Sequence, residues 1–257
     1  MIRLEHFRYL GHNRRDFVMR EAILSETVYS GPVTEEWHYH EHEHLSLIID
    51  GGNREEREGK EIIAKPGTLI RYPAGIVHRN RNTKFPSRNF NLSFTETFLT
   101  KVDGFTLTED DHDLSFAVLK IYRECQINEL HTDGIINDIL LSCYVDNSRT
   151  KSSCSDQMKI VREVLHDRWS ELVSLDELSK ASGLHPVTVS KWFPKCYRCT
   201  VGEYARKLKV ANAMKKIRES GEHLTRIGLA CGFFDQSHFI RAFKSVTGLN
   251  PKQWRNV

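Results

Sequence analysis

Two stretches near the C-terminus follow one pattern: a short amphipathic segment, a glycine, and a second amphipathic segment. In the first stretch, Ser174 and Glu177 have the spacing of a capping box, and Gly183 can adopt the positive φ that ends a helix. The second stretch places Gly232 at the turn and Asp235 where it can cap the next helix. This repetition predicts two helix-turn-helix units.

The core of this region is predicted from helical spacing. Residues 201–219 form one amphipathic helix between the units. The inward stripe of the first short helix is expected at three apolar positions: Leu175, Leu178 and Ala181. A small helical bundle whose glycines are ordinary turns is the alternative, and it is less compatible with the pattern occurring twice.

The second helix of a helix-turn-helix unit can reach base edges in a major groove. The candidate DNA contacts are the outward positions of these helices: Val187, Thr188, Ser190, Lys191, Gln236, Ser237, His238 and Arg241. Lys191 and Arg241 are expected to contribute most, whereas Thr188 and His238 suit phosphate contacts. Residues 156–257 hold 18 Lys and Arg against 10 Asp and Glu, a net +8, whereas residues 1–155 carry a net −5. A polyanion such as double-stranded DNA is therefore the expected partner, although solubility alone can also explain a basic domain.

The chain before these units has a different period. From about residue 17 to 107, short apolar stretches alternate with Gly and Pro turns, which predicts a β-sandwich or barrel. Two helices are expected between about 112 and 146. The predicted fold is α+β with two domains: a β-barrel with two helices (1–147), a linker (148–155) and an all-α DNA-binding domain (156–257).

Residues 37–44 read Trp-His-Tyr-His-Glu-His-Glu-His. In one continuous strand, alternate residues project from the same face, so His38, His40, His42 and His44 would share it. A bulge could turn His42 outward. Elsewhere, Cys196 and Cys199 have a spacing found in redox and zinc sites, but a single such pair is weak evidence.

Residues 173–256 resemble the DNA-binding domain of the AraC/XylS family of transcription regulators. The resemblance rests on the block from Ile227 to Lys244, followed by Gly248 to Pro251 and Trp254-Arg255. It implies two recognition helices that enter successive major grooves, one helical turn apart. The sequence is expected to differ from the usual family pattern at two positions. Gly228 stands where the family usually has alanine, and Cys199 stands where it usually has glycine.

The N-terminal region resembles the cupin barrel in two motifs. His38, His40, His44 and Gly51 fit the first, with His44 in a position usually held by Glu; the second is matched at Gly67, Pro73, Gly75, His78 and Asn82. In cupin enzymes, the positions of His38, His40, His44 and His78 bind a metal, and four imidazoles could hold a divalent transition metal such as Zn, Ni, Cu or Fe. In regulators of this family the barrel usually binds a small effector without metal. A metal site, a metal-free effector site and a vestigial pocket all stay open.

The resemblance implies an effector-responsive, sequence-specific transcription regulator, more often an activator, with RNA polymerase as a partner. A homodimer formed through the helices near 112–146 is expected, although these helices could instead pack wholly on their own barrel. No nucleophile–base pair accompanies the histidines, so no catalytic residue is expected; the alternative is a metal-dependent cupin enzyme fused to a DNA-binding module. A constitutive DNA-binding protein with an inert barrel is a third hypothesis. Without a signal peptide or an apolar run long enough for a membrane span, a cytoplasmic protein is expected.

Overall fold

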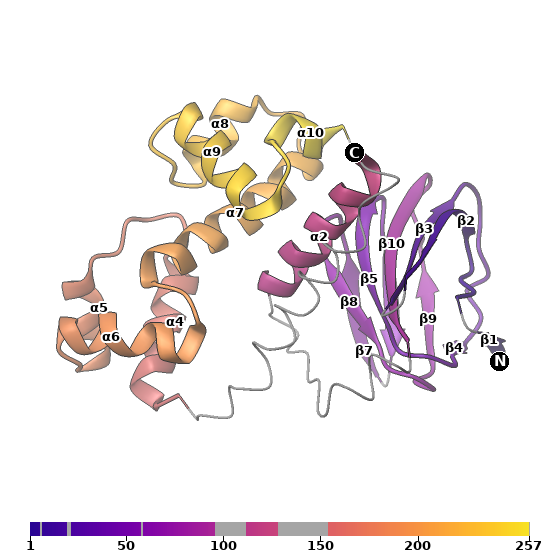
Figure 1. Cartoon of the computed structure of the whole chain (residues 1–257), viewed down its shortest axis with the longest axis horizontal. Coiled ribbons are helices and arrows are strands. Elements are labelled where there is room, and N and C mark those ends of the chain that lie inside the picture. Colours follow the sequence, from indigo (N-terminus) through magenta and orange to yellow (C-terminus); the bar gives the residue numbers. More distant parts are fainter. Residues whose placement is uncertain (6, 20–21, 58, 96–111, 128–153, 257) are drawn as a thin grey trace. The chain divides into compact units, whose positions relative to one another are not determined.

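The structure is a computed structural model that describes residues 1–5, 7–19, 22–57, 59–95, 112–127 and 154–256. The described residues divide into two compact units, one up to Ile127 and one from Cys154 onward. The first is β-rich and the second is helical, as predicted (Figure 1). None of the helices in the described part of the chain combines the length and apolarity that crossing a bilayer requires.

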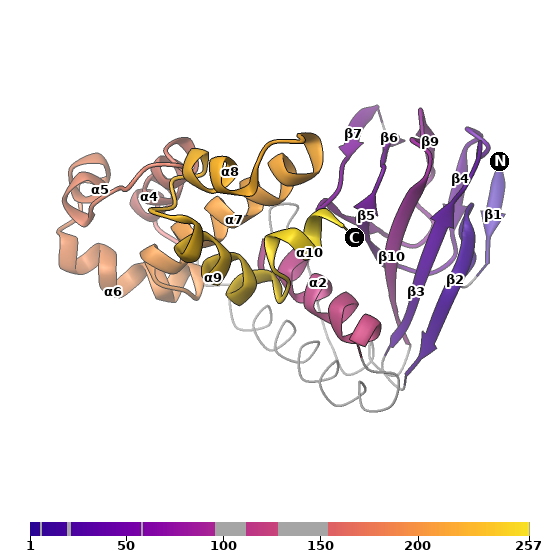
Figure 2. The ribbon, with the colours of Figure 1, turned by 90° about the horizontal axis from the view of Figure 1, so that it is seen from above.

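The first unit contains two five-stranded sheets among the described residues, in the orders β1-β4-β9-β6-β7 and β2-β3-β10-β5-β8 (Figure 2). The bounds are β1 Ile2–Leu4, β2 His12–Val18, β3 Ala22–Tyr29, β4 His38–His40, β5 His44–Asp50, β6 Asn53–Arg57, β7 Lys60–Ala64, β8 Leu69–Tyr72, β9 His78–Arg81 and β10 Ser87–Phe94. Strands β1 and most of β2 precede residue 17, where the sequence analysis placed the start of β structure. That start was therefore too late.

Strand β10 alternates polar and apolar side chains, and the two kinds face different surroundings. Phe90 and Leu92 pair with Leu47 and Leu45 of β5, so these apolar residues share one face of the sheet. Helix α2 (His112–Ile127) packs there, with the ring of Tyr122 5.2 Å from that of Phe90 (Figure 1). The opposite face carries a row of buried polar side chains: Asn89, Asn91, Ser93, Ser46 and His44. The space between the sheets therefore has a polar part beside these residues and an apolar part formed by Ile48, Ala64 and Ile70.

The second unit consists of helices α4 Asp156–Asp167, α5 Leu175–Ser182, α6 Pro186–Tyr197, α7 Val201–Glu219, α8 Leu224–Ala230, α9 Gln236–Thr247 and α10 Pro251–Arg255. Its first half packs around one apolar cluster: Met158, Val161, Leu165, Leu178, Val189, Phe193 and Leu208. In the second half, Phe239, Phe243 and Trp254 are fully buried, and the Trp254 indole donates to the Met214 carbonyl at 3.0 Å.

The inward face of α5 differs from the prediction. Leu178 is buried as expected, but Ser182 accompanies it, and Leu175 and Ala181 are exposed. The Ser182 hydroxyl can be buried because it donates to the Leu178 carbonyl at 2.7 Å. A serine whose hydroxyl bonds to its own helix thus occupies a buried position, which the pattern of apolar residues alone does not predict.

Helix α2 confirms the first of the two helices expected between 112 and 146. The expected second helix and the linker from 148 to 153 lie outside the described residues. The helical unit starts at Asp156, and Ser155 caps α4 by accepting from the Met158 amide.

Candidate functional site

Each predicted helix-turn-helix unit has the local structure that its sequence indicates. Ser174 and Glu177 form the predicted capping box of α5, and Gly183 ends that helix with φ 72°. Asp235 caps α9 by accepting from the His238 amide at 2.6 Å. At Gly232 (φ 76°), an added Cβ would lie 1.8 Å from the Ser170 carbonyl oxygen, so only glycine fits this turn.

Helix α6 is anchored by its inner face and leaves its outer face in solvent. Val189 and Phe193 are fully buried, whereas Val187 is 59% exposed. Ser190 and Lys191 are also exposed, and Thr188 is half-buried in the first turn. These positions match the outward face expected from the sequence.

Helix α9 has the same arrangement. Phe239 and Phe243 are fully buried, and the candidate DNA contacts Gln236, Ser237, His238 and Arg241 are exposed. The His238 ring packs edge-on against Phe233, with centroids 5.5 Å apart. This contact holds the side chain beside the first turn of α9.

Trp192, which is not among the predicted DNA contacts, is 52% exposed on α6. The Lys195 ammonium lies 4.2 Å from the centroid of its indole. A cation held over an aromatic ring has fewer rotamers to lose when it meets an anion. The sequence could have indicated Trp192 only by its position one helical turn after Thr188. Its contact with Lys195 depends on the helical fold.

Helix α7 connects the two helix-turn-helix units without a break. Thr200 and Glu203 form a capping box at its start. Lys209 on this helix donates to the Gly232 carbonyl at 2.9 Å, which connects the turn of the second helix-turn-helix unit to α7. Leu208, Ala211 and Met214 are buried along one side of this helix, which confirms that it is amphipathic.

The two expected departures from the AraC/XylS pattern have different outcomes. Gly228 lies against Phe239, where an added Cβ would be 2.8 Å from the ring, so the glycine permits the close approach of α8 and α9. The departure placed at Cys199 falls one residue earlier, because Arg198 holds the left-handed conformation (φ 59°) that ends α6. Cys199 itself is buried.

A second candidate site lies between the sheets of the first unit. His38 on β4 and His78 on β9 are direct partners across the ladder, with ring centroids 4.3 Å apart. His40 completes a group of three buried histidines whose ligand atoms lie within 4.8 Å of one another. Three imidazoles in this arrangement can coordinate one transition-metal ion.

Backbone contacts determine which ring nitrogen is free to bind. His38 Nδ1 lies 3.1 Å from the Glu36 carbonyl, and His78 Nδ1 lies 3.0 Å from the Ile76 carbonyl. A carbonyl oxygen can only accept, so Nδ1 carries the proton in both rings and Nε2 keeps its lone pair. His78 Nε2 is buried without a hydrogen-bond partner. A backbone partner on the second nitrogen is the usual support for a metal-binding histidine.

The chain bends at residues 41–43, so the predicted continuous strand with four histidines on one face is wrong. His38 and His40 belong to one sheet and His44 to the other. His44 lies outside the group of three: its ring is 4.4 Å from that of His40 but stacks on Tyr72 at 4.7 Å with an interplanar angle of 9°. His42 lies at the bend and is half-buried.

Burial keeps these imidazoles neutral. Loss of solvent lowers the pKa of His38 and of His78 to about 4, and that of His44 to about 3. The neighbouring His78 lowers the pKa of His38 further, because two adjacent rings cannot easily share positive charge. The pKa of His40 is lowered for the same two reasons, burial first. Neutral rings are the form that binds metal.

Tyr72 and Glu55, which were not predicted from the sequence, lie next to the histidines and position them. Tyr72 donates to Glu55 at 2.6 Å, and the guanidinium of Arg57 donates to the same carboxylate at 2.8 Å. Glu55 is completely buried, so Arg57 balances its charge. Tyr72 is thereby fixed in the position where it stacks on His44.

The cavity between the sheets is small and polar. Its volume is about 10 Å³, close to the minimum that one water molecule requires. Several side-chain atoms that line it are buried and unpartnered: His78 Nε2, Ser46 Oγ, Asn80 Oδ1 and Asn89 Oδ1. Unpaired buried polar atoms of this kind are costly unless an ion or water meets them.

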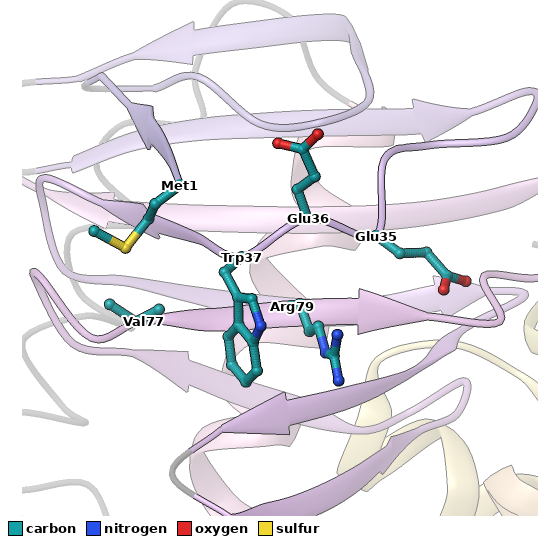
Figure 3. Close-up of a pocket in the computed structure, with 6 residues that line it drawn as sticks. All are labelled: Met1, Glu35, Glu36, Trp37, Val77 and Arg79. Atoms are coloured by element: carbon teal, nitrogen blue, oxygen red, sulfur yellow. The ribbon is translucent and has the colours of Figure 1, made fainter.

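The outer side of the same strands carries a shallow hollow, in which Trp37 and Arg79 lie side by side (Figure 3). The Arg79 guanidinium lies 4.6 Å from the Trp37 ring centroid and donates to Glu56 at 2.7 Å. Trp37 precedes His38 and Arg79 follows His78, so this contact braces the backbone that positions both histidines.

Comparison with known proteins supports both halves of this description. The family model for the helix-turn-helix domain of AraC type matches residues 178–256, and that for the cupin domain matches residues 25–85. YobQ of Bacillus subtilis, named as an HTH-type transcriptional regulator, is 23% identical over 93% of this chain and 95% of its own.

Two further proteins show the extent of the similarity. PqrA of Proteus vulgaris, named as a probable transcription factor, is 30% identical over 34% of this chain and 70% of its own. The solved structure of ToxT from Vibrio cholerae aligns with 92% of this chain and 98% of its own, with 10% identity and a TM-score of 0.40. The helix-turn-helix match lies on the repeated units, and the cupin match includes the three grouped histidines. The chain therefore belongs to the AraC/XylS family of transcription regulators, with a cupin domain preceding its DNA-binding domain.

Proposed function

We propose that this protein is a sequence-specific regulator of transcription, controlled by a divalent transition metal that His38, His40 and His78 hold inside the barrel. One observation carries the metal assignment: three buried imidazoles bring their ligand atoms within 4.8 Å of one another. The cavity beside them, about 10 Å³, suits an ion or a water better than an organic effector.

The donor set supports a borderline metal. Imidazole nitrogen suits Zn, Ni, Cu and Fe(II), and three protein ligands leave a position open on a four-coordinate ion. His44 is a supporting residue in this proposal, because it is not among the three histidines whose ligand atoms lie within 4.8 Å of one another. When bound, the ion would connect His38 and His40 of β4 to His78 of β9. Metal binding would therefore restrain these two strands relative to each other.

DNA recognition is assigned to the exposed faces of α6 and α9. Lys191 and Arg241 would make the principal contacts, with Val187, Ser190, Gln236 and Ser237 at neighbouring base edges, and Thr188 and His238 at phosphates. Arginine can bond two acceptors of one guanine, whereas lysine acts as a point charge. Seven of these eight positions are exposed and Thr188 is half-buried, which supports the assignment. We also propose that the regulator is an activator that works with RNA polymerase; a reporter transcribed from a selected site, with and without the protein, tests the direction of control.

A homodimer is proposed through the helices between residues 112 and 146. The described helix α2 packs its apolar side on its own barrel, as the alternative expects, so the proposal depends on the second expected helix, which lies outside the described residues. Sedimentation of the full chain at micromolar concentration distinguishes a dimer from a monomer. A strictly monomeric species contradicts this part of the proposal.

The metal proposal is tested with full-length protein stripped by a chelator and titrated with Zn²⁺ and Ni²⁺. We expect one ion per chain, bound much more tightly than about millimolar, and a loss of at least about 100-fold in affinity for His78→Ala. His12→Ala is the control, because it removes an exposed imidazole outside the cavity. Unchanged binding in His78→Ala contradicts the site.

Control by the metal is tested separately, by comparing DNA affinity with and without the ion. Equal affinities in both states contradict the regulatory role while leaving the metal site intact. Turnover of a small molecule by the metal-loaded chain favours the enzyme alternative instead.

A further inference from the structure

Cys196, in the last turn of α6, has a different neighbour from the one that the sequence indicates. Cys196 and Cys199 have the spacing of a thiol pair, yet the structure connects the Cys196 side chain by a hydrogen bond to Cys154. Cys199 lies beyond the end of α6, where Arg198 turns the chain, and is buried. Cys154 lies directly before Ser155, the cap of α4.

Packing holds these two thiols together. Both side chains lie against the apolar cluster of the first half of the helical unit. Tyr197, the neighbour of Cys196, donates to the Met158 carbonyl in the first turn of α4 at 3.1 Å. The last turn of α6 is therefore attached to the start of α4, where Cys154 lies.

The two sulfurs have unequal surroundings. Burial, with a smaller contribution from the adjacent Cys154, raises the pKa of Cys196 to about 12. Cys154 lies at the N-terminus of α4 and close to the Lys159 ammonium. The Lys159 ammonium is itself paired with Asp156 at 2.8 Å. Because the raised pKa keeps the Cys196 thiol protonated, we assign the attack to Cys154 and make Cys196 the resolving thiol.

We propose that Cys154 and Cys196 form a reversible disulfide when the protein meets a hydroperoxide. The Cys154 thiolate attacks one peroxide oxygen, the O–O bond breaks, and an alcohol or water leaves, so that Cys154 becomes a sulfenic acid. The Cys196 sulfur then attacks the Cys154 sulfur, the S–S bond forms and water is released. In total, two thiols lose two electrons and two protons, and the peroxide is reduced.

This bond would fasten the chain entering the DNA-binding unit to the end of its first recognition helix. A cross-link that closes such a loop stabilises the folded state against unfolding. Oxidation is therefore expected to raise the thermal midpoint of the helical unit, and a thiol reductant to reverse the rise.

The test uses reduced full-length protein treated with stoichiometric hydrogen peroxide and then with a thiol-alkylating reagent. Peptide mapping by mass spectrometry is expected to find the Cys154 peptide joined to the Cys196 peptide. Cys154→Ser and Cys196→Ser should abolish the link and the rise in thermal midpoint. Cys199→Ala, the matched control, should retain both.

Three results overturn the proposal. The first is a link between Cys196 and Cys199, and the second is a link between two chains, seen as a dimer on a non-reducing gel. The third is full alkylation of both thiols after peroxide treatment. Because the mapping reads the bond directly, a variant that folds poorly does not obscure the result for the natural chain.

Discussion

His38 and His78 lie opposite each other across the β4–β9 ladder with their ring centroids 4.3 Å apart. Neither ring can gain a proton without placing positive charge against the other in a water-poor cavity. Without a metal ion, the stability of the first unit must therefore depend on pH.

The metal-free protein should lose stability in mild acid. The pKa of His38 and of His78 is lowered to about 4 and that of His44 to about 3, from the ordinary value of about 6.5. The unfolded chain thus takes up protons first as the pH falls. The free energy of unfolding is at its full value above about pH 6.5. It declines towards about pH 4, by up to about 1.4 kcal/mol per pH unit for each histidine.

Denaturant unfolding of the full chain in a chelator, at about pH 7.5 and about pH 5.5, measures this loss. Changes in other groups are subtracted by repeating the series with His78→Gln, whose slope should be shallower. Equal slopes for the two proteins contradict the buried, neutral state of His78.

Arg241→Ala should weaken DNA binding at fixed salt about tenfold or more, because the exposed guanidinium on α9 is expected to bond a base edge. The DNA is a duplex selected from random sequences by the natural protein. Lys215→Ala is the matched control: it removes one exposed positive charge from α7, away from the outer face of α9. An equal loss in both variants means that Arg241 contributes general charge and no base recognition.

The spacing of the two DNA contacts should be fixed. Helix α7 has 19 residues, about 28 Å of continuous helix, between the units. Inserting about five base pairs between the contacted blocks should abolish two-site binding, and about ten, one full helical turn, should fail to restore it. Recovery at the full turn, measured by gel shift, indicates a flexible connection instead.

Gly228→Ala should destabilise the helical unit by about 1–3 kcal/mol, although alanine favours helix more than glycine. The new Cβ would lie 2.8 Å from the ring of Phe239, which is fully buried and cannot move aside. Gly202→Ala on α7 is the control, because nothing lies within 4 Å of its added Cβ. Denaturant unfolding compares the two; a stabilised Gly228→Ala protein contradicts the clash.

The sequence predicted the helix-turn-helix units in detail because their signals are local. The capping pair Ser174 and Glu177, the cap at Asp235 and the turn at Gly232 each act within a few residues. Ser182 was missed because its hydroxyl bonds to its own helix and so behaves as a small buried residue. The eight outward positions assigned to DNA stay a prediction.

The histidine site was predicted only in part. Motif spacing identified His38, His40, His44 and His78, and all four line the cavity, although only His38, His40 and His78 form the close group. Treating residues 37–44 as one strand wrongly placed His42 on the same face. The bend at residues 41–43 depends on which sheet each half joins, and that is decided by partners far along the chain. Tyr72, Glu55 and Arg57 were missed for the same reason, because their contacts cross between strands.

The separation of apolar and polar faces along β10 has a further consequence. Phe90 and Leu92 contribute to the packing that holds α2, whereas Asn89 and Asn91 line the cavity on the other side of the strand. Replacing Asn89 or Asn91 therefore changes the cavity without removing a side chain that contacts α2 from β10. The ligand specificity proposed for the barrel can therefore be altered at the polar face of β10 separately from the packing between this strand and α2.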